Sequence, residues 1–489
     1  MTAPFALYID GRFEAGAATF DSIDPATGQV WAQMPEARID EVERAVTAAE
    51  RALRDPAWAG LTASQRGRLL YRLADLLEHA APELAALETR DTGKIVRETR
   101  GQIAYVAHYY RYYAGIADQV RGHVVPVDKP DMQVWIKREP LGVVAAIVPW
   151  NSQLFLSAVK LGPALAAGCT VVLKASEEAP APLLAFARLI HEAGFPPGVV
   201  NIITGFGPEC GAVLSRHPKV SLVAFTGGPE TARHIIRNTA DNLAKVSLEL
   251  GGKSPLVVFA DADIDSAVNA QLAAIFAASG QSCVAGSRLL IEAGVKDAFL
   301  ARLIEKVNAI RVGAPDDAQT EYGPLCTERQ LRTIETVVAQ SIEQGARLLT
   351  GGHRIERDGF YYAPTVLDCS GVPRAMSEIT ELFGPVLSID VFSDEADAIA
   401  KANSTDYGLA AGVFTRDLTR AHRMSQAIHA GVVWLNTYRA VSPHAPFGGY
   451  GLSGHGREGG ADAVLDYTTT KTVWLRTSDA PMGDPFVMR

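Results

Sequence analysis

From about residue 141 onward the chain alternates short apolar runs with segments of helical periodicity, and this alternation limits the folds open to it. Strands that alternate with helices indicate parallel, doubly wound sheets. We therefore expect an α/β protein in which two α/β domains follow one another. The runs of the first series are GVVAAIV (142–148), CTVVLK (169–174), GVVNIIT (198–204) and VSLVAFTG (220–227), and those of the second include SPLVVF (254–259), RLLIE (288–292) and PVLSIDVF (385–392).

Amphipathic helices are expected before the first of these strands. The repeats DEVERAVTAAERAL (40–53) and SQRGRLLYRLADLLEHAAPELAAL (64–87) place apolar residues at helical spacing. A third segment, 101–120, carries five tyrosines. Aromatic residues at this spacing favour a core or an interface over a ligand-stacking face.

Length, charge and cysteine usage exclude several classes of protein. A chain of 489 residues predicts two or three domains, and the net charge of −9 argues against nucleic acid or an anionic membrane as partner. The start of the chain lacks the pattern of a secretory signal, and no segment suits a bilayer span. Five scattered cysteines without a CxxC pair indicate neither a disulfide framework nor a zinc site, so a reducing cytoplasm is expected.

Polar residues stand at the ends of the predicted strands, where α/β proteins bind ligands. Asn151 follows the strand at 142–148, Lys174 and Glu177 follow the next, and Glu249 lies beside two glycines in LELGGKSP. Cys283, in GQSCVAGSR, has small neighbours that leave its sulfur accessible. An amide, a lysine, two carboxylates and a cysteine at such places together indicate a catalytic site.

Two glycine-bearing turns that follow strands are candidate phosphate sites. TGFGPECG (204–211) and FTGGPETA (225–232) each lead toward a helix, where backbone N–H groups favour a pyrophosphate. Neither matches GxGxxG, and such turns also occur without ligands. Each therefore remains a candidate on this evidence.

The motifs PWN, KASE, FTGG, LELGGKSP, GQSCVAGSR, ELFGPV and PFGGYGLSGHGREGG occur in an order and spacing that resemble the NAD(P)-dependent aldehyde dehydrogenase superfamily. The resemblance spans nearly the whole chain. It implies a Rossmann-type cofactor domain (1–121 and 141–251), an α/β catalytic domain (252–452) and a small β oligomerisation flap (122–140 and 468–489). A homodimer or homotetramer and no bound metal are expected with it.

The resemblance also implies the catalytic roles. Cys283 is then the nucleophile that forms a thiohemiacetal and a thioester, Asn151 holds the oxyanion, and Glu249 activates the hydrolytic water. Members that pass the acyl group to coenzyme A generally lack a glutamate at this place, so Glu249 favours hydrolysis to the free acid. The aldehyde itself is not identified by the sequence.

A further set of residues is implied to bind the cofactor. Lys174 and Glu177 resemble the pair that binds the adenosine ribose, and the Glu177 carboxylate favours NAD over NADP because it repels a 2′-phosphate. Glu381 resembles the residue that holds the nicotinamide ribose. The complete expected set is Trp150, Lys174, Glu177, Gly207, Phe225, Thr226, Gly227, Gly228, Leu250, Glu381 and Phe383.

The sequence also departs from the pattern of the family. Gly228 and Ala232 stand where many members have serine and glycine, so backbone N–H groups would have to bind the pyrophosphate. Ser152 and Gln153 replace an aromatic position after PWN, and Val159 replaces a tryptophan of some substrate tunnels. These changes predict a wider or more polar tunnel, for a bulky or functionalised aldehyde.

Two rival interpretations remain open at this point. A cofactor-free thiol hydrolase would use Cys283 and Glu249 alone, but it leaves Lys174, Glu177 and Glu381 without a role. A non-catalytic protein on the same scaffold would need none of the catalytic residues. Measured NAD binding and aldehyde oxidation would separate both from a dehydrogenase.

Overall fold

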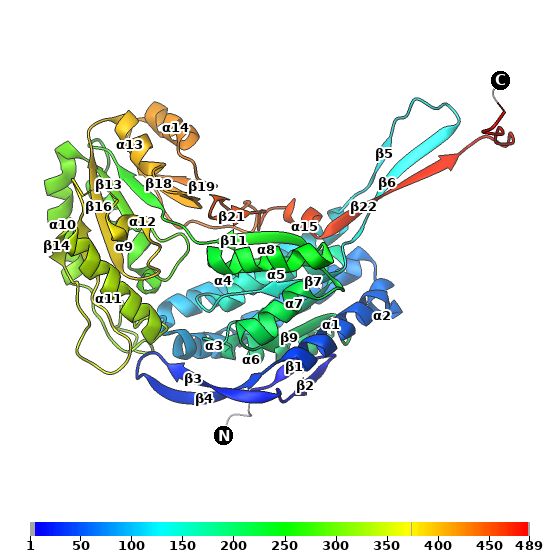
Figure 1. Ribbon diagram of the computed structural model, residues 1–489, viewed down its shortest axis with the longest axis horizontal. Coiled ribbons are helices and arrows are strands. Elements are labelled where there is room, and N and C mark those ends of the chain that lie inside the picture. The colour runs from blue at the N-terminus through cyan, green and yellow to red at the C-terminus, as the bar shows by residue number, and fades with distance from the viewer. Residues whose placement is uncertain (1–4, 373, 488–489) are drawn as a thin grey trace.

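A computed structural model describes residues 5–372 and 374–487 and confirms the α/β class. Figure 1 shows two lobes, each built around a sheet, and an arm that projects from one of them. The larger sheet has eight strands in the order β2-β1-β9-β8-β7-β10-β11-β21, and the smaller has seven in the order β14-β15-β16-β13-β12-β18-β19. Both series of strands expected from the apolar runs are present.

The central strands of the larger sheet are parallel and buried on both faces. All five residues of β7 are buried: Val144 and Ala146 pack on one side of the sheet, while Val143, Ala145 and Ile147 pack on the other. The parallel strands are β7 (Val143–Ile147), β8 (Thr170–Ala175), β9 (Val200–Thr204), β10 (Val220–Gly227) and β11 (Lys245–Leu250).

Helices cover both faces of this sheet (Figure 1). The longest of them, α3 (Ala63–Thr92), begins at a capping box in which Thr62 and Gln65 exchange side-chain-to-backbone hydrogen bonds. It ends at Gly93, which has φ of 78°. The helices are α1 (Ile39–Arg54), α2 (Pro56–Ala59), α3 (Ala63–Thr92), α4 (Val96–Ile116), α5 (Gln153–Ala167), α6 (Ala181–Ala193), α7 (Ala212–Arg216) and α8 (Pro229–Asn242).

The sequence analysis did not identify the strands before residue 39. β1 (Leu7–Ile9) and β2 (Arg12–Glu14) extend the larger sheet, and β3 (Ala18–Asp24) pairs with β4 (Gln29–Glu36). At the opposite edge, β21 (Gly454–His455) pairs antiparallel with β11. The chain therefore returns to the larger sheet after leaving the smaller one, which brings residues near 455 beside Glu249.

The smaller sheet carries the second series of strands and helices. Its strands are β12 (Pro255–Val258), β13 (Arg288–Glu292), β14 (Arg347–Thr350), β15 (Thr365–Asp368), β16 (Val386–Phe392), β18 (Ala410–Phe414) and β19 (Val432–Leu435). Its helices are α9 (Ile264–Ile275), α10 (Lys296–Asn308), α11 (Glu328–Glu343), α12 (Met376–Ile379), α13 (Glu395–Ala402) and α14 (Leu418–Ala427). The pair β17 (Tyr407–Gly408) and β20 (Tyr450–Gly451), and α15 (Ala463–Asp466), complete the regular structure of this half of the chain.

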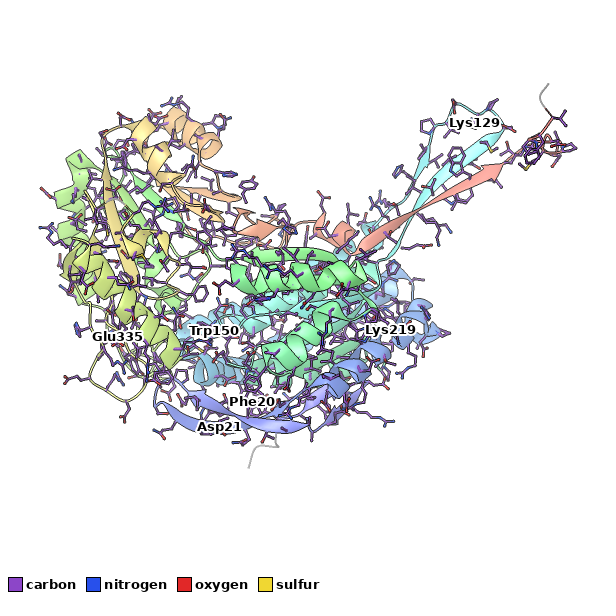
Figure 2. All side chains as sticks on the ribbon, in the orientation of Figure 1. Phe20, Asp21, Lys129, Trp150, Lys219 and Glu335 are labelled. Atoms are coloured by element: carbon purple, nitrogen blue, oxygen red, sulfur yellow. The ribbon has the colours of Figure 1, made fainter. Side chains whose placement is uncertain are left out.

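The arm is a three-stranded sheet in the order β22-β6-β5. β5 (His123–Val125) and β6 (Met132–Pro140) form the hairpin expected at 122–140, and β22 (Thr468–Arg476) pairs along the whole of β6. Figure 2 shows Lys129 at its tip. Among the residues described here, none of the helices combines the length and apolar composition that a bilayer crossing requires.

Candidate active site

Cys283 lies in the loop that joins α9 to β13. The preceding turn holds Ala278 and Ser279 at φ of 52° and 54°, a left-handed conformation that non-glycine residues seldom adopt. The hydroxyl of Ser279 anchors this turn by donating a hydrogen bond to the Gly323 carbonyl at 2.9 Å. Cys283 is half-buried, whereas the other four free cysteines are buried: Cys169, Cys210, Cys326 and Cys369.

The thiol of Cys283 is held in its neutral form. Burial raises its pKa to about 12, and the nearby carboxyl groups of Glu381 and Glu249 act in the same direction. The guanidinium of Arg439 acts in the opposite direction. A thiolate therefore forms at neutral pH only when a base removes the proton or a positive charge enters the site.

Asn151 lies in the turn that joins β7 to α5 and lines the same cavity as Cys283. This cavity has a volume of about 420 Å³. One N–H of the Asn151 side chain donates to the Gln281 carbonyl at 3.1 Å, which leaves the second N–H for a ligand. Gln281 is itself fixed, because its side-chain oxygen accepts a hydrogen bond from the backbone N–H of Cys326 at 2.8 Å.

Glu249 lies on β11 and lines this cavity as well. Its carboxyl group is buried against Gly448, where a Cβ would fall 2.6 Å from the Glu249 Oε1 atom. Neither carboxyl oxygen has a hydrogen-bond partner among the described residues. Burial raises the pKa of Glu249 well above its ordinary value, and repulsion from Glu458 adds to this rise. The neutral acid is thereby favoured until a water or substrate enters.

The sequence analysis did not identify a buried ion pair beside Glu249. Lys160, on α5, donates to the Thr226 hydroxyl at 2.7 Å and also pairs with Glu458. Lys160 is fully buried, and Glu458 and Thr226 both line the cavity. The lysine within the otherwise apolar helix 153–167 was a sign that a buried charge needs a partner. That partner could not be identified from the sequence, because it lies 298 positions away.

A second cavity of about 670 Å³ opens at the carboxyl ends of β7, β8 and β10. Thr226 lines both cavities, so they adjoin at the end of β10. A Cβ at Gly207 or Gly228 would meet no protein atom within 4 Å, so the space beside both glycine turns is open to a ligand. Of the expected cofactor residues, Trp150, Lys174, Glu177, Gly207, Phe225, Thr226, Gly227 and Gly228 line this cavity.

Lys174 and Glu177 are in contact within this second cavity. The Lys174 ammonium donates to a Glu177 carboxylate oxygen at 3.1 Å and to the Ala175 carbonyl at 3.1 Å. Lys174 is buried, while Glu177 remains partly exposed. The lining also includes Thr231, near the expected pyrophosphate turn, which the sequence analysis did not select. Thr231 thus adds a side-chain hydroxyl near Gly228, a turn in which backbone N–H groups alone were expected to bind the pyrophosphate.

Glu381 lies against the two glycines that follow β11. The Gly252 N–H donates to Glu381 Oε1 at 3.0 Å, and a Cβ at Gly251 would fall 1.7 Å from Glu381 Oε2. Burial raises the pKa of Glu381 to about 7. Phe383 packs edge-on against Trp150 with ring centroids 5.6 Å apart. Figure 2 shows Trp150 where the two lobes meet.

The remaining expected residues divide between the cavities and the core. Leu250 lines the Cys283 cavity and not the second cavity. Ser152 and Val159 also line the Cys283 cavity, whereas Gln153 is fully buried outside its lining. Tyr105 and Tyr109 line it as well, so the tyrosine-rich helix α4 contributes to the cavity as well as to the core. Among the described residues, no group of three or more His, Cys, Asp or Glu side chains is arranged to hold a metal ion.

Comparison with known proteins agrees with this geometry. Residues 13–473 match the model of the family described as Aldehyde dehydrogenase family. The chain is 74% identical over 485 residues, 99% of each chain, to a (Z)-2-((N-methylformamido)methylene)-5-hydroxybutyrolactone dehydrogenase from Acinetobacter baylyi.

Two solved structures with bound NAD are also similar to the chain. PnpE from Pseudomonas sp. WBC-3, in complex with nicotinamide adenine dinucleotide, is 43% identical with a TM-score of 0.96, covering 99% of this chain and 100% of that one. The NAD⁺ complex of an aldehyde dehydrogenase from Bacillus cereus is 38% identical with a TM-score of 0.95, covering 97% of each chain.

Proposed function

The chain belongs to the aldehyde dehydrogenase family, and on that premise we propose that it oxidises an aldehyde to the carboxylic acid with NAD, through a covalent intermediate on Cys283. One observation supports this most strongly. Cys283, Asn151 and Glu249, which come from three separate parts of the sequence, line a single cavity. That cavity adjoins a second one lined by Lys174 and Glu177.

The first step is the attack of Cys283 on the aldehyde carbonyl carbon. The thiol proton passes to solvent, a carbon–sulfur bond forms, and one electron pair of the carbonyl double bond moves to oxygen. The free N–H of Asn151 and the backbone N–H of Cys283 then bind the resulting oxyanion, where preorganised donors are most effective. Bound NAD would supply the acceptor for the hydride on this carbon.

The second step is hydrolysis of the thioester left on Cys283. Glu249 takes a proton from a water molecule, whose oxygen adds to the thioester carbon, and the thiol leaves with a proton. The raised pKa of Glu249 suits a base that works near neutral pH, because a more acidic carboxylate would attract the proton too weakly. The charge of Lys160 opposes this rise in the pKa of Glu249.

The residues of the second cavity fit NAD. Lys174 and Glu177 provide a cation and a carboxylate for ribose hydroxyl groups, and the Glu177 charge repels a 2′-phosphate. The N-terminus of α8 and the open space at Gly228 suit a pyrophosphate. Phe383 packs against Trp150, and Glu381 accepts a hydrogen bond from the Gly252 N–H after β11; these two residues would contact the nicotinamide half.

We extend the proposal to the substrate from the Acinetobacter baylyi relative. That protein is named for a 5-hydroxybutyrolactone, which is the ring-closed form of a 4-oxo acid. At 74% identity the two chains are expected to accept the same class of compound. The small side chains of Ser152 and Val159 leave room in the cavity for a branched molecule of this kind.

The domain boundaries and the assembly complete the proposal. The cofactor domain comprises 1–121 and 141–251, the catalytic domain comprises 252–452, and the arm serves as an oligomerisation flap. Trp474 and Leu475 on the arm are exposed apolar side chains on an open sheet edge, which a second subunit would cover in a homodimer or homotetramer. We place the enzyme in the cytoplasm.

NADH formation tests the proposed function directly. The purified protein is mixed with NAD or NADP and a panel of aliphatic, aromatic and oxo-acid aldehydes, beside the Cys283→Ala variant. Reduction of NAD that disappears in Cys283→Ala is expected. Reduction that persists in this variant would contradict the role of Cys283. Thioester hydrolysis without aldehyde oxidation or NAD binding would favour the cofactor-free hydrolase instead.

A further inference from the structure

Arg439 carries the only positive charge among the described residues that line the Cys283 cavity. It lies in the loop after β19, in the segment 438–447 that closes one side of this cavity. The side chain is partly buried, and its charge opposes the burial that raises the pKa of the Cys283 thiol. Arg439 thus places a positive charge at the wall of the space in which the aldehyde must bind.

The neighbouring loop residues hold Arg439 in place. The Tyr438 hydroxyl donates to the Val284 carbonyl at 3.0 Å, and the Trp434 indole N–H donates to the Ala440 carbonyl at 2.9 Å. Between these two anchors, the backbone of Arg439 has φ of 61°. A strained conformation of this kind persists when the surroundings fix it, and such residues concentrate at ligand sites.

Some N–H donors of the Arg439 guanidinium make no hydrogen bond within the described residues. Its Nη1 donates to the carbonyls of Ala273 at 3.0 Å and Ala277 at 3.4 Å, at the end of α9. Within the part of the chain that the structure describes, its Nε and Nη2 groups donate no hydrogen bond and the guanidinium forms no ion pair. These two carbonyl groups orient the guanidinium and partly balance its charge. The other edge of the planar guanidinium keeps N–H donors without a partner among the described residues.

The carboxylates that share the cavity do not neutralise Arg439. Glu458 is paired with Lys160, which also donates to the Thr226 hydroxyl. Glu249 is buried without a hydrogen-bond partner among the described residues, and the neutral form of its carboxyl group is favoured. The cavity therefore offers one unmatched cation, and a planar guanidinium fork matches the geometry of a carboxylate.

Resting on the aldehyde oxidation proposed above, we infer that Arg439 binds a carboxylate carried by the substrate and thereby selects 4-oxo acids over uncharged aldehydes. A 5-hydroxylactone opens to such an acid. Its hydroxyl group loses a proton and becomes the aldehyde carbonyl, while the ring carbon–oxygen bond breaks and its electron pair leaves on the new carboxylate. The ring-opened form then presents its aldehyde to Cys283 and its carboxylate to Arg439, and the oxidised product is a dicarboxylate.

A matched pair of substrates tests this inference. 4-Oxobutanoate and butanal have the same chain length, but only the first carries a carboxylate. In Arg439→Gln, kcat/KM for 4-oxobutanoate is expected to fall about 10- to 100-fold, as expected when charged hydrogen bonds are lost, whereas kcat/KM for butanal changes less than about threefold. Arg439→Lys, which keeps the charge without the fork, is expected to lie between Arg439→Gln and the unmodified enzyme.

Tyr105→Phe is the control variant. Its hydroxyl donates to the Val441 carbonyl at 3.1 Å, so its removal loosens the same loop without removing charge. Both substrates are expected to respond equally to this change. Thermal unfolding of all three variants shows whether each is folded.

The outcomes separate the inference from the function on which it rests. An equal loss with both substrates in a folded Arg439→Gln protein, or an unchanged preference, would overturn the role of Arg439 while leaving Cys283-dependent oxidation of butanal in place. Absence of NADH formation with either substrate in the unmodified enzyme would overturn the proposed function and this inference with it. In the unmodified enzyme, added chloride is also expected to raise KM for 4-oxobutanoate alone.

Discussion

The ammonium group of Lys160 lies 2.7 Å from the hydroxyl oxygen of Thr226, the residue at which the two cavities adjoin. Lys160 is fully buried and also pairs with Glu458, whose charge opposes ionisation of Glu249. A single buried cation thus balances one carboxylate and limits the rise in the pKa of the proposed base. This arrangement links the stability of the site to its pH dependence.

Replacement of Lys160 by methionine is expected to affect both properties. Glu458 would remain buried without its partner, which lowers the free energy of unfolding by about 3–5 kcal/mol. The Lys160 charge lowers the pKa of Glu249, so its loss raises that pKa further. The acid limb of the kcat profile is therefore expected to move to higher pH. Denaturant unfolding and a pH–rate profile measure the two effects.

The double variant Lys160→Met with Glu458→Leu is the control. It removes the carboxylate together with the cation, and is expected to recover part of the stability and part of the pH shift. If the double variant has the same free energy of unfolding and the same pH–rate profile as Lys160→Met, the ion pair does not act as described.

The first α/β region was predictable from local pattern, whereas the catalytic roles were expected from the resemblance to a known family. Each strand from β7 to β10 is a short apolar run, and Lys174, Glu177 and Glu249 stand at or just after a strand end. Strands β1 and β2 were not predicted because each has three residues, with Arg12 and Phe13 exposed, and their pairing depends on β9 far along the chain. Lys160 and Arg439 were not predicted because their roles follow from partners distant in sequence.

The reactivity of Cys283 without cofactor is expected to rise continuously with pH. The neutral thiol dominates below its pKa of about 12, so the thiolate fraction grows tenfold for each pH unit below that value. Alkylation by iodoacetamide in the absence of NAD should therefore show no plateau between about pH 7 and 10. The Cys283→Ser variant reports the slow background from the four buried cysteines. A plateau near pH 8.5, the value of an ordinary thiol, would contradict the buried, proton-retaining environment.

Replacement of Glu177 by serine is expected to relax the preference for NAD. The change removes the carboxylate that would repel a 2′-phosphate and frees the Lys174 ammonium from its 3.1 Å contact. The ratio of kcat/KM for NADP to that for NAD should rise at least about tenfold, because juxtaposed like charges oppose binding by several kcal/mol. Glu230→Gln, which removes a carboxylate from the first turn of α8 outside the cavity lining, is the matched control. An equal change in both variants would assign the effect to overall charge.

Trapping the acyl group on Cys283 tests the central claim most directly. In Glu249→Gln the attack and oxidation steps remain possible, but the general base for hydrolysis is missing. We predict that one equivalent of NADH forms per active site and that the peptide containing Cys283 gains the mass of the acyl group, with slow turnover afterwards. Continued turnover of Glu249→Gln at the unmodified rate, or acylation at a residue other than Cys283, would contradict the proposed mechanism.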